Sequence, residues 1–257
     1  MKKSIYLLYS ISVFILGLIT GCTPTKVFNL EPFGATNSTV INGRTVVKES
    51  KDSVDIVASF VGLYHDYAVF DIEVFNRTNH DLLVAPKDFM LKPFNEDKTP
   101  YFYQNQEYVG YLAIDPTEEI IKLDNRMVKE EKRIKTAKTV NTILAIAGAV
   151  TLIAGATKSS GYRETASARN TMALGETMLR FGLTKGAVDR SLYYSRMDQY
   201  ASEKDVWQHQ TFLKNVISPN SSLRGDVFIR YTAAAPLMQI SFPTQSDDIV
   251  IWFEKGK

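Results

Sequence analysis

The sequence has 257 residues, of which 45% are hydrophobic and 23% are charged. This is enough apolar material for a substantial core and too much for a generally disordered chain. A single cysteine excludes an internal disulfide and a multi-cysteine zinc site. The net charge of +2 comes from Lys2 and Lys3, because the other basic and acidic residues balance at 28 each. Bulk charge therefore gives no indication of nucleic-acid binding.

The N-terminus has the pattern of a secretory signal. Two lysines, an apolar run over residues 5–19 and small residues precede Cys22. The run is short for a membrane span, which needs about 20 residues. The tetrapeptide at 19–22 resembles the lipobox of bacterial lipoproteins. The resemblance implies a signal peptide over residues 1–21, cleavage before Cys22, diacylation of its sulfur and acylation of the new amino group. Two or three acyl chains anchor a protein stably, whereas one does not.

The residue after the cysteine bears on where the anchored chain goes. Gram-negative lipoproteins that stay in the inner membrane commonly carry Asp there, whereas this chain has Thr23. By that resemblance we expect a lipid-anchored protein of the cell envelope, at the outer membrane more than the inner. An ordinary cleaved signal with an incidental cysteine and an uncleaved N-terminal anchor are the alternatives.

Strand signals occupy two separate parts of the mature chain. Residues 22–50 are expected to form a tether and a short hairpin around the Asn-Gly dipeptide at 42–43, which is typical of a type I′ turn. A first group of strands is predicted over residues 51–114, where residues 67–75 alternate between apolar and polar side chains. A second group is predicted over residues 206–257. Strands before and after a helical block predict one antiparallel sandwich completed across an insertion.

The insertion is predicted to be a helical hairpin over residues 115–205. Residues 115–118 provide an N-cap Asp, a Pro at the first helical position and a Glu at the third, which together are typical of a helix start. A second helical region is predicted over residues 163–203. Gly182 and Gly186 are expected to interrupt or bend it.

Some of the predicted strands carry a recognisable strand-and-turn pattern. It runs over residues 70–78 and 83–89, and a Pro-to-Gly loop from Pro219 leads into a late strand at 226–231. In this respect the chain resembles the immunoglobulin-like domains of uncharacterised bacterial surface lipoproteins, in which an Asn-Xaa-Thr turn follows a core strand. The resemblance covers about residues 54–112 and 207–253 and excludes the helices. It implies a mainly β fold with an α insertion, an immunoglobulin-like sandwich interrupted by a long hairpin, and it indicates a fold more than an activity.

Residues 139–157 form an uncharged segment of 19 residues, just long enough to span a bilayer. Within it, Ala147, Thr151 and Gly155 recur at four-residue spacing, and Gly148 adds a further small residue. Such a row lets helices approach closely in membranes. These four residues are therefore the candidates for association or membrane contact.

Two observations weigh against a complete membrane span. A single crossing would leave the two strand groups on opposite sides, unable to share a sheet. Charged residues such as Arg180 and Asp189 make the second helix a poor return crossing. We expect a hairpin whose apolar tip packs on its own second helix or on another copy, with insertion of the tip into a membrane, or pore assembly, as the alternative. In either case the tip should contact something, because one partner helix rarely covers so long an uncharged segment.

No catalytic or metal-binding motif is recognisable, and the three histidines lie in no ligand spacing. We therefore predict no enzymatic activity, no cofactor and no metal. Tyr101, Tyr103 and Tyr108 belong to an aromatic cluster that could stack on a sugar, so a carbohydrate-binding surface module is a further alternative. The leading expectation is a binding, structural or assembly protein of the envelope, with a protein partner or a second copy and no nucleic acid.

Overall fold

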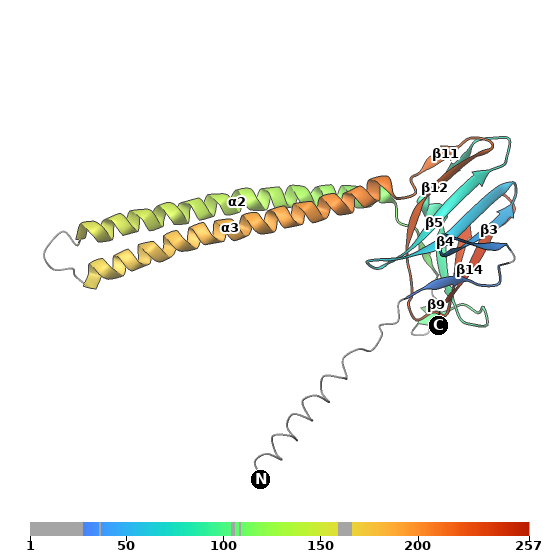
Figure 1. The fold of residues 1–257 in the computed structure, drawn as a ribbon, viewed down its shortest axis with the longest axis horizontal. Helices are drawn as coiled ribbons and strands as arrows, with labels where there is room; N and C mark the ends of the chain where they lie inside the picture. The colour runs from blue at the N-terminus through green and yellow to red at the C-terminus, as the bar shows by residue number, and fades with distance from the viewer. Residues whose placement is uncertain (1–27, 36, 104–105, 108, 159–165, 257) are drawn as a thin grey trace, which may run out of the picture.

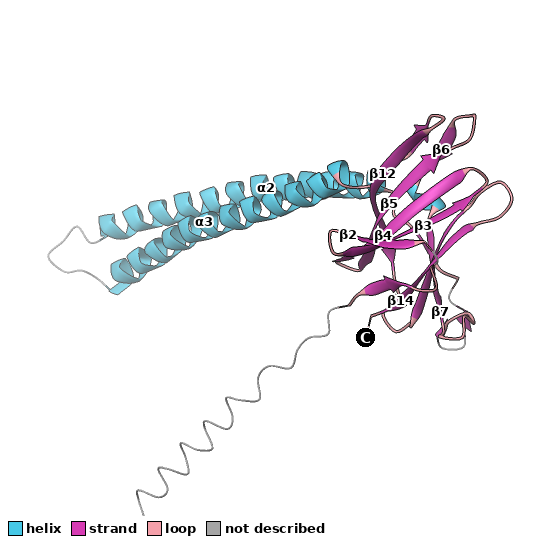
Figure 2. Cartoon of the chain, turned by 45° about the vertical axis from the view of Figure 1, so that its right-hand side comes forward, coloured by secondary structure: helices cyan, strands magenta, loops and turns pink. Residues whose placement is uncertain are grey.

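The computed structural model describes residues 28–35, 37–103, 106–107, 109–158 and 166–256. A β body lies at one end, and two long helices project from it side by side (Figure 1). Coloured by secondary structure, the projection is helical and the body consists of strands and loops, apart from a short helical turn (Figure 2). The predicted combination of a β body with a helical insertion is confirmed.

The body contains two five-stranded antiparallel sheets. The first, in spatial order, contains β1 (Leu30–Pro32), β14 (Ile249–Lys255), β13 (Leu237–Phe242), β7 (Met90–Phe94) and β10 (Tyr111–Leu112). The second contains β12 (Ser221–Arg230), β5 (Tyr67–Asn76), β4 (Val54–Tyr64), β3 (Arg44–Lys51) and β2 (Ser38–Ile41). Shorter elements are the pair β6 (Leu82–Val84) and β11 (Asn215–Ile217), the pair β8 (Phe102–Tyr103) and β9 (Gln106–Glu107), and the 3-10 helix η1 (Pro86–Asp88).

Strands from before and after the insertion are mixed in both sheets. β12 pairs with β5 over its whole length, from Ser221 opposite Asn76 to Arg230 opposite Tyr67. In the other sheet, β13 lies between β7 and β14. The sheets are therefore completed across the insertion, as the sequence predicts.

One apolar core fills the space between the two sheets. The alternation predicted for residues 67–75 supplies its centre, because Ala68, Phe70, Ile72 and Val74 of β5 are all fully buried. The ring of Phe70 lies 5.1 Å from that of Phe253 in the opposite sheet, measured between centroids. The core therefore holds the two sheets face to face.

The predicted tight turn between β2 and β3 is present. Asn42 and Gly43 both have positive φ, 51° and 78°, and Ile41 pairs with Arg44 across the turn. Positive φ at both central residues defines the type I′ turn, which matches the twist of the strands it joins. The Asn-Gly dipeptide thus fixes the register of β2 on β3.

The insertion consists of α2 (Pro116–Lys158) and α3 (Ala166–His209). α2 begins at the predicted residue, and the carboxylate of Asp115 accepts a hydrogen bond from the Thr117 N–H at 3.0 Å. This contact satisfies one of the backbone donors that every helix N-terminus leaves without an intrahelical partner.

The predicted interruption of the second helix and its predicted end are both wrong. α3 continues through Gly182 and Gly186, because a glycine costs a helix only about 1 kcal/mol, which close packing against α2 offsets at Gly182. α3 also extends past residue 205 to His209, into a stretch predicted to be strand. The reason is Trp207, whose β-favouring side chain is instead buried against the body at the end of the helix.

Candidate functional site: the helical hairpin

Both ends of the hairpin are tied to β12. Before α2, the N–H of Ile114 donates to the carbonyl of Phe228 at 2.9 Å, and after α3 the N–H of Phe212 donates to the carbonyl of Asp226 at 2.8 Å. Gly225 allows this approach, since a Cβ at that position would lie 2.7 Å from the backbone nitrogen of Phe212. These hydrogen bonds to β12 therefore fix the points at which the two helices join the body.

A second apolar cluster fixes the base of the hairpin on the outer face of that sheet. Trp207 of α3 is 1% exposed, and its ring centroid lies 4.6 Å from that of Phe228 and 6.2 Å from that of Tyr64. Leu123 of α2 and Val69 of β5 complete the cluster. Large side chains thus join both helices to the body and set the direction in which the hairpin projects.

Farther out, small residues hold the two helices together along what we call the seam. The seam positions are buried and recur every seven residues, as Asn141, Gly148 and Gly155 in α2 and as Ala168, Gly175, Gly182 and Asp189 in α3. A seven-residue repeat keeps one face of each helix on its partner. A Cβ at Gly148 would lie 2.5 Å from the backbone nitrogen of Leu179, and one at Gly175 equally close to that of Leu152. The two backbones are in direct contact there.

A polar cluster lies in the seam on the side nearer the body. The Asn141 amide donates to the Asp189 carboxylate at 2.9 Å, and the Lys185 ammonium donates to the same oxygen at 2.7 Å. The hydrogen bond from Lys185, followed by that from Asn141, lowers the pKa of Asp189. Because a buried amide and carboxylate meet in only one alignment of the helices, this pair fixes their register.

Eight large apolar side chains on the far half of the hairpin are exposed to solvent. Four of them, in α2, are 59–65% exposed, and the four in α3 are more than half exposed. They are Ile143, Ile146, Val150 and Ile153 in α2 and Leu174, Phe181, Leu183 and Val188 in α3. Within the described chain, α2 alone is long and apolar enough to cross a membrane, yet only 17% of its most apolar window is buried. In a helix pair that contacts only water, such apolar residues would face the partner helix.

The small seam residues also leave a groove of about 670 Å³ along one side of the hairpin. Gly182 and Gly186 line it together with Ala145, and larger side chains such as Ile146 and Leu183 border the same space. Lys138, Asp189 and Arg190 also line the groove, so it connects the exposed apolar surface to charged side chains.

The four residues predicted for association have different positions in the structure. Gly148 and Gly155 lie in the seam, whereas Ala147 and Thr151 are only partly buried. The Thr151 hydroxyl donates to the Ala147 carbonyl within α2, at 2.8 Å. Helix packing follows the seven-residue repeat and not the four-residue spacing on which the prediction rested. The matching repeat that begins at Ala168 was not predicted, although small residues at that interval are visible in the sequence.

The described residues do not test the other predicted site residues. Cys22 and Tyr108 lie outside the described residues. Tyr103 lies in β8, and Tyr101, which precedes β8, is partly buried. The lipidation site and the aromatic sugar platform therefore stay predictions.

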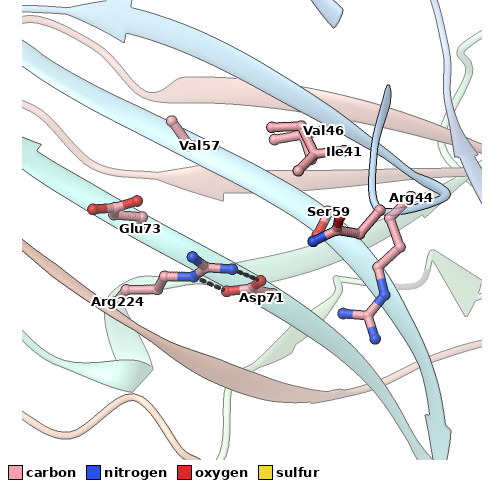
Figure 3. Close-up of a pocket in the computed structure, with 9 residues that line it drawn as sticks. Ile41, Arg44, Val46, Val57, Ser59, Asp71, Glu73 and Arg224 are labelled. Carbon is pink, nitrogen blue, oxygen red and sulfur yellow. Dashed lines mark hydrogen bonds and ion pairs between the residues drawn. The ribbon is translucent and has the colours of Figure 1, made fainter. Parts of the chain in front are cut away.

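A smaller cavity of about 330 Å³ lies on the outer face of the second sheet (Figure 3). Arg224 donates through Nε and Nη2 to the two carboxylate oxygens of Asp71, at 2.8 and 2.6 Å, and this pairing raises the pKa of the Arg224 guanidinium. Nearby, burial and the Asp71 charge raise the pKa of Asp226. None of the described residues that line the cavity is aromatic, so it has no surface on which a sugar could stack.

Within the described residues, no group of three or more His, Cys, Asp or Glu side chains could hold a metal ion. His65 occupies the turn between β4 and β5, and the ring of His80 contacts Asn79. The ring of His209 lies 3.0 Å from the Asp205 carboxylate at the end of α3. The contacts of His80 and His209 therefore join residues that are close in the sequence.

Comparison with protein-family models, with curated proteins and with solved structures finds no match to this chain. The functional argument therefore depends on the geometry of the hairpin and on the sequence signals at the N-terminus.

Proposed function

We propose that this chain is a non-enzymatic lipoprotein of the bacterial cell envelope and that its helical hairpin is the element through which it associates. The observation that carries the proposal is the exposed apolar surface on the far half of a hairpin whose base is fixed to the body. Such a surface is costly in water unless something covers it. The rigid base means that whatever contacts the hairpin is held at a defined distance from the body.

We propose Cys22 as the anchor. The mature chain would begin at this residue and carry two or three acyl chains, which suffice for stable attachment to a membrane. Thr23 favours the outer membrane over the inner, by resemblance to other lipoproteins. With 43 residues in α2, the hairpin extends about 65 Å at 1.5 Å per residue. That reach suits a bridging or assembly role next to the anchoring membrane.

We propose further that the body is immunoglobulin-like. Two facing antiparallel sheets support this, and so does the Asn-Xaa-Thr turn on which the resemblance rests. The fully buried Asn76 donates from its amide to the carbonyls of His80 and Ile217, both at 2.8 Å, and its Oδ1 accepts from the Thr78 hydroxyl at 2.6 Å. The turn therefore has a structural role, connecting the end of β5 to β11.

The anchor is tested by growing cells that express the full chain with labelled palmitate, beside the Cys22→Ala variant. We expect label and a mature N-terminus at residue 22 in the wild type alone. An unlabelled wild-type product, or one that keeps its leader, would refute the lipoprotein assignment.

The association element is tested by a photo-reactive phenylalanine analogue placed in intact cells at Ile146 of the hairpin or at Leu83 of the body. Ile146 is 59% exposed and Leu83 is 57% exposed, so the two positions are matched in access to solvent. We expect covalent adducts from position 146 and few from position 83. Adducts from position 83 alone would show that the body makes the contacts.

A further inference from the structure

The outer faces of the two helices differ in chemistry along the far half of the hairpin. A residue two positions from the seam points about 200° away from it, because each helical residue turns about 100°. In α2 these outer positions hold Ile143, Ile146, Val150 and Ile153, all exposed. In α3 they hold small or polar residues, namely Ala173, Thr177, Arg180, Thr184, Ala187 and Ser191, also exposed. The face opposite the seam is therefore apolar in α2 and small or polar in α3, whereas the exposed apolar residues of α3, such as Phe181 and Leu183, lie one position from the seam, on the sides of the hairpin.

The apolar row of α2 continues toward the body into basic residues. Residues 132, 135, 139, 143, 146, 150 and 153 follow one another at intervals of three or four, so they form a single row along the helix. Lys132 and Lys135, at its start, are exposed and make no ion pair within the described residues. The row contains no acidic residue. We call these seven positions the outer row.

We infer that the outer row of α2 is a membrane-docking surface that lies on a bilayer rich in anionic lipid. This inference rests on the proposed role of the hairpin as the association element and names its partner. The isoleucines and the valine would enter the boundary between headgroups and acyl chains, while Lys132 and Lys135 contact lipid phosphates. α3 would stay in water on the opposite side. Arg180 and its ion-pair partner Glu176 make a full span through the bilayer unfavourable.

The dimensions of the apolar row favour a bilayer over a second copy of the chain. From Ile143 to Ile153 it extends about 15 Å, and a helix is about 10 Å wide, so its footprint is roughly 150 Å². A stable protein interface buries about 800 Å² on each partner. A parallel pair of such rows would also place lysines against lysines. A bilayer supplies the opposite charge, and a chain already anchored there needs only a weak second contact to dock.

Vesicle flotation tests the inference without the acyl anchor. The protein is the chain from residue 22 onward with Cys22→Ala, and the vesicles contain phosphatidylcholine alone or with about 30% phosphatidylglycerol, which supplies the negative surface potential. We expect binding about tenfold stronger to the anionic vesicles. Replacing Ile143, Ile146, Val150 and Ile153 by Ser should weaken it about 100-fold, because their burial drives insertion. The control Val40→Ser/Ile41→Ser removes exposed apolar side chains from β2 and should leave binding unchanged.

Labels at single positions test the orientation. Because Cys22 is the one cysteine of the sequence, Val150→Cys and Thr184→Cys in the Cys22→Ala background each carry one polarity-sensitive dye. We expect the dye at position 150 to move into an apolar environment on anionic vesicles and the dye at position 184 to stay in water. Circular dichroism confirms that each variant keeps its helices.

Three results would overturn the inference. Absence of vesicle binding excludes a docking surface, and a shift of both dyes indicates that the hairpin tip inserts instead of lying on the surface. Sedimentation that shows a dimer of the wild type and a monomer of the four-Ser variant, without vesicle binding, assigns the face to a second copy. None of these results depends on acylation, so failure of the lipoprotein assignment is detected separately by the palmitate experiment.

Discussion

The base and the far half of the hairpin are held together in opposite ways. At the base, large side chains point inward, and the buried Trp207 packs on aromatic residues of the second sheet. In the far half, glycines bring the backbones into contact, and many of the large apolar side chains are exposed. The base is a continuation of the folded body, stabilised by burial of apolar surface in water. The far half buries little such surface, which is the distribution found between helices in membranes.

This difference shows that helix length and mean apolarity are poor guides to the role of a segment. The uncharged stretch of α2 is apolar enough to cross a bilayer, but its partner α3 is polar along its outer face. Which side of each helix carries the apolar residues determines how the pair meets its surroundings. The following changes test that distinction.

Removal of the base contact should have the largest effect. We expect Trp207→Ala to lower the free energy of unfolding by about 3–5 kcal/mol, because it leaves a cavity among Tyr64, Val69 and Phe228. The indole N–H has no hydrogen-bond partner within the described structure, so Trp207→Phe should cost much less. Urea unfolding followed by circular dichroism measures both.

Tyr194→Ala is the matched control for that change. This aromatic residue of α3 is 62% exposed, so its removal should alter stability by no more than about 0.5 kcal/mol. Equal losses at positions 194 and 207 would contradict the assignment of the base as part of the core.

Acid should weaken the body more than the far half. Burial of the Asp55 carboxylate acts to raise its pKa. Hydrogen bonds from Arg77, Lys48 and Ser50 outweigh this effect and lower the pKa from 3.8 to about 2. The charged carboxylate therefore stabilises the fold above pH 4, and that contribution is lost as the pH falls from 4 toward 2. We expect a loss of about 1–2 kcal/mol, since solvent screens the exposed partners.

Unfolding of the wild type and of Asp55→Asn at several pH values checks this expectation. The variant should be less stable at neutral pH and should show a shallower decline between pH 4 and pH 2. Parallel curves for the two proteins would place the acid-sensitive group elsewhere. Residues 139–157 contain no titratable side chain and contribute nothing to the difference.

The seam can be tested with two glycines of the same helix. A Cβ at Gly175 would lie 2.5 Å from backbone, whereas one at Gly186 would lie 3.8 Å from its nearest neighbour. Alanine gains about 1 kcal/mol over glycine in a helix, but a forced contact costs about 1–3 kcal/mol. We therefore expect Gly175→Ala to destabilise by about 1–2 kcal/mol and Gly186→Ala to stabilise by about 0.5–1 kcal/mol.

The readout that separates packing from helix propensity is the interhelical distance. Spin labels on the two helices next to the seam should move apart in Gly175→Ala and keep their distance in Gly186→Ala. A gain in stability at both positions would mean that the backbones are not in contact.

The sequence predicts those parts of the fold that depend on neighbouring residues. Alternation in β5, the Asn-Gly turn and the helix start at Pro116 are local signals, and each agrees with the structure. The end of α3 could not be predicted in this way. Trp207 favours a strand by local propensity, and only its contact with the distant β5 and β12 gives it a helical position.

The candidate site was predictable in composition but not in arrangement. The uncharged segment and its small residues are visible in α2, yet the partner of each glycine depends on the register between the helices. That register is fixed by Asn141 and Asp189, which are 48 residues apart. No pattern within α2 identifies its partner in α3, so the inward and outward faces of each helix depend on a contact between residues that are distant in the sequence.

The ion pairs that connect the helices near the base should have the smallest effect. The Lys204 ammonium lies 2.6 Å from the Asp124 carboxylate, on the opposite helix, and both side chains are partly exposed. A double-mutant cycle with Lys204→Ala and Asp124→Ala should give a coupling energy of about 0.2–1 kcal/mol. The pair Arg180 and Glu176, within α3 alone, is the comparison, and its coupling should be about 0.3–0.5 kcal/mol. A much larger coupling at the base would mean that charge contributes strongly to holding the two helices together there.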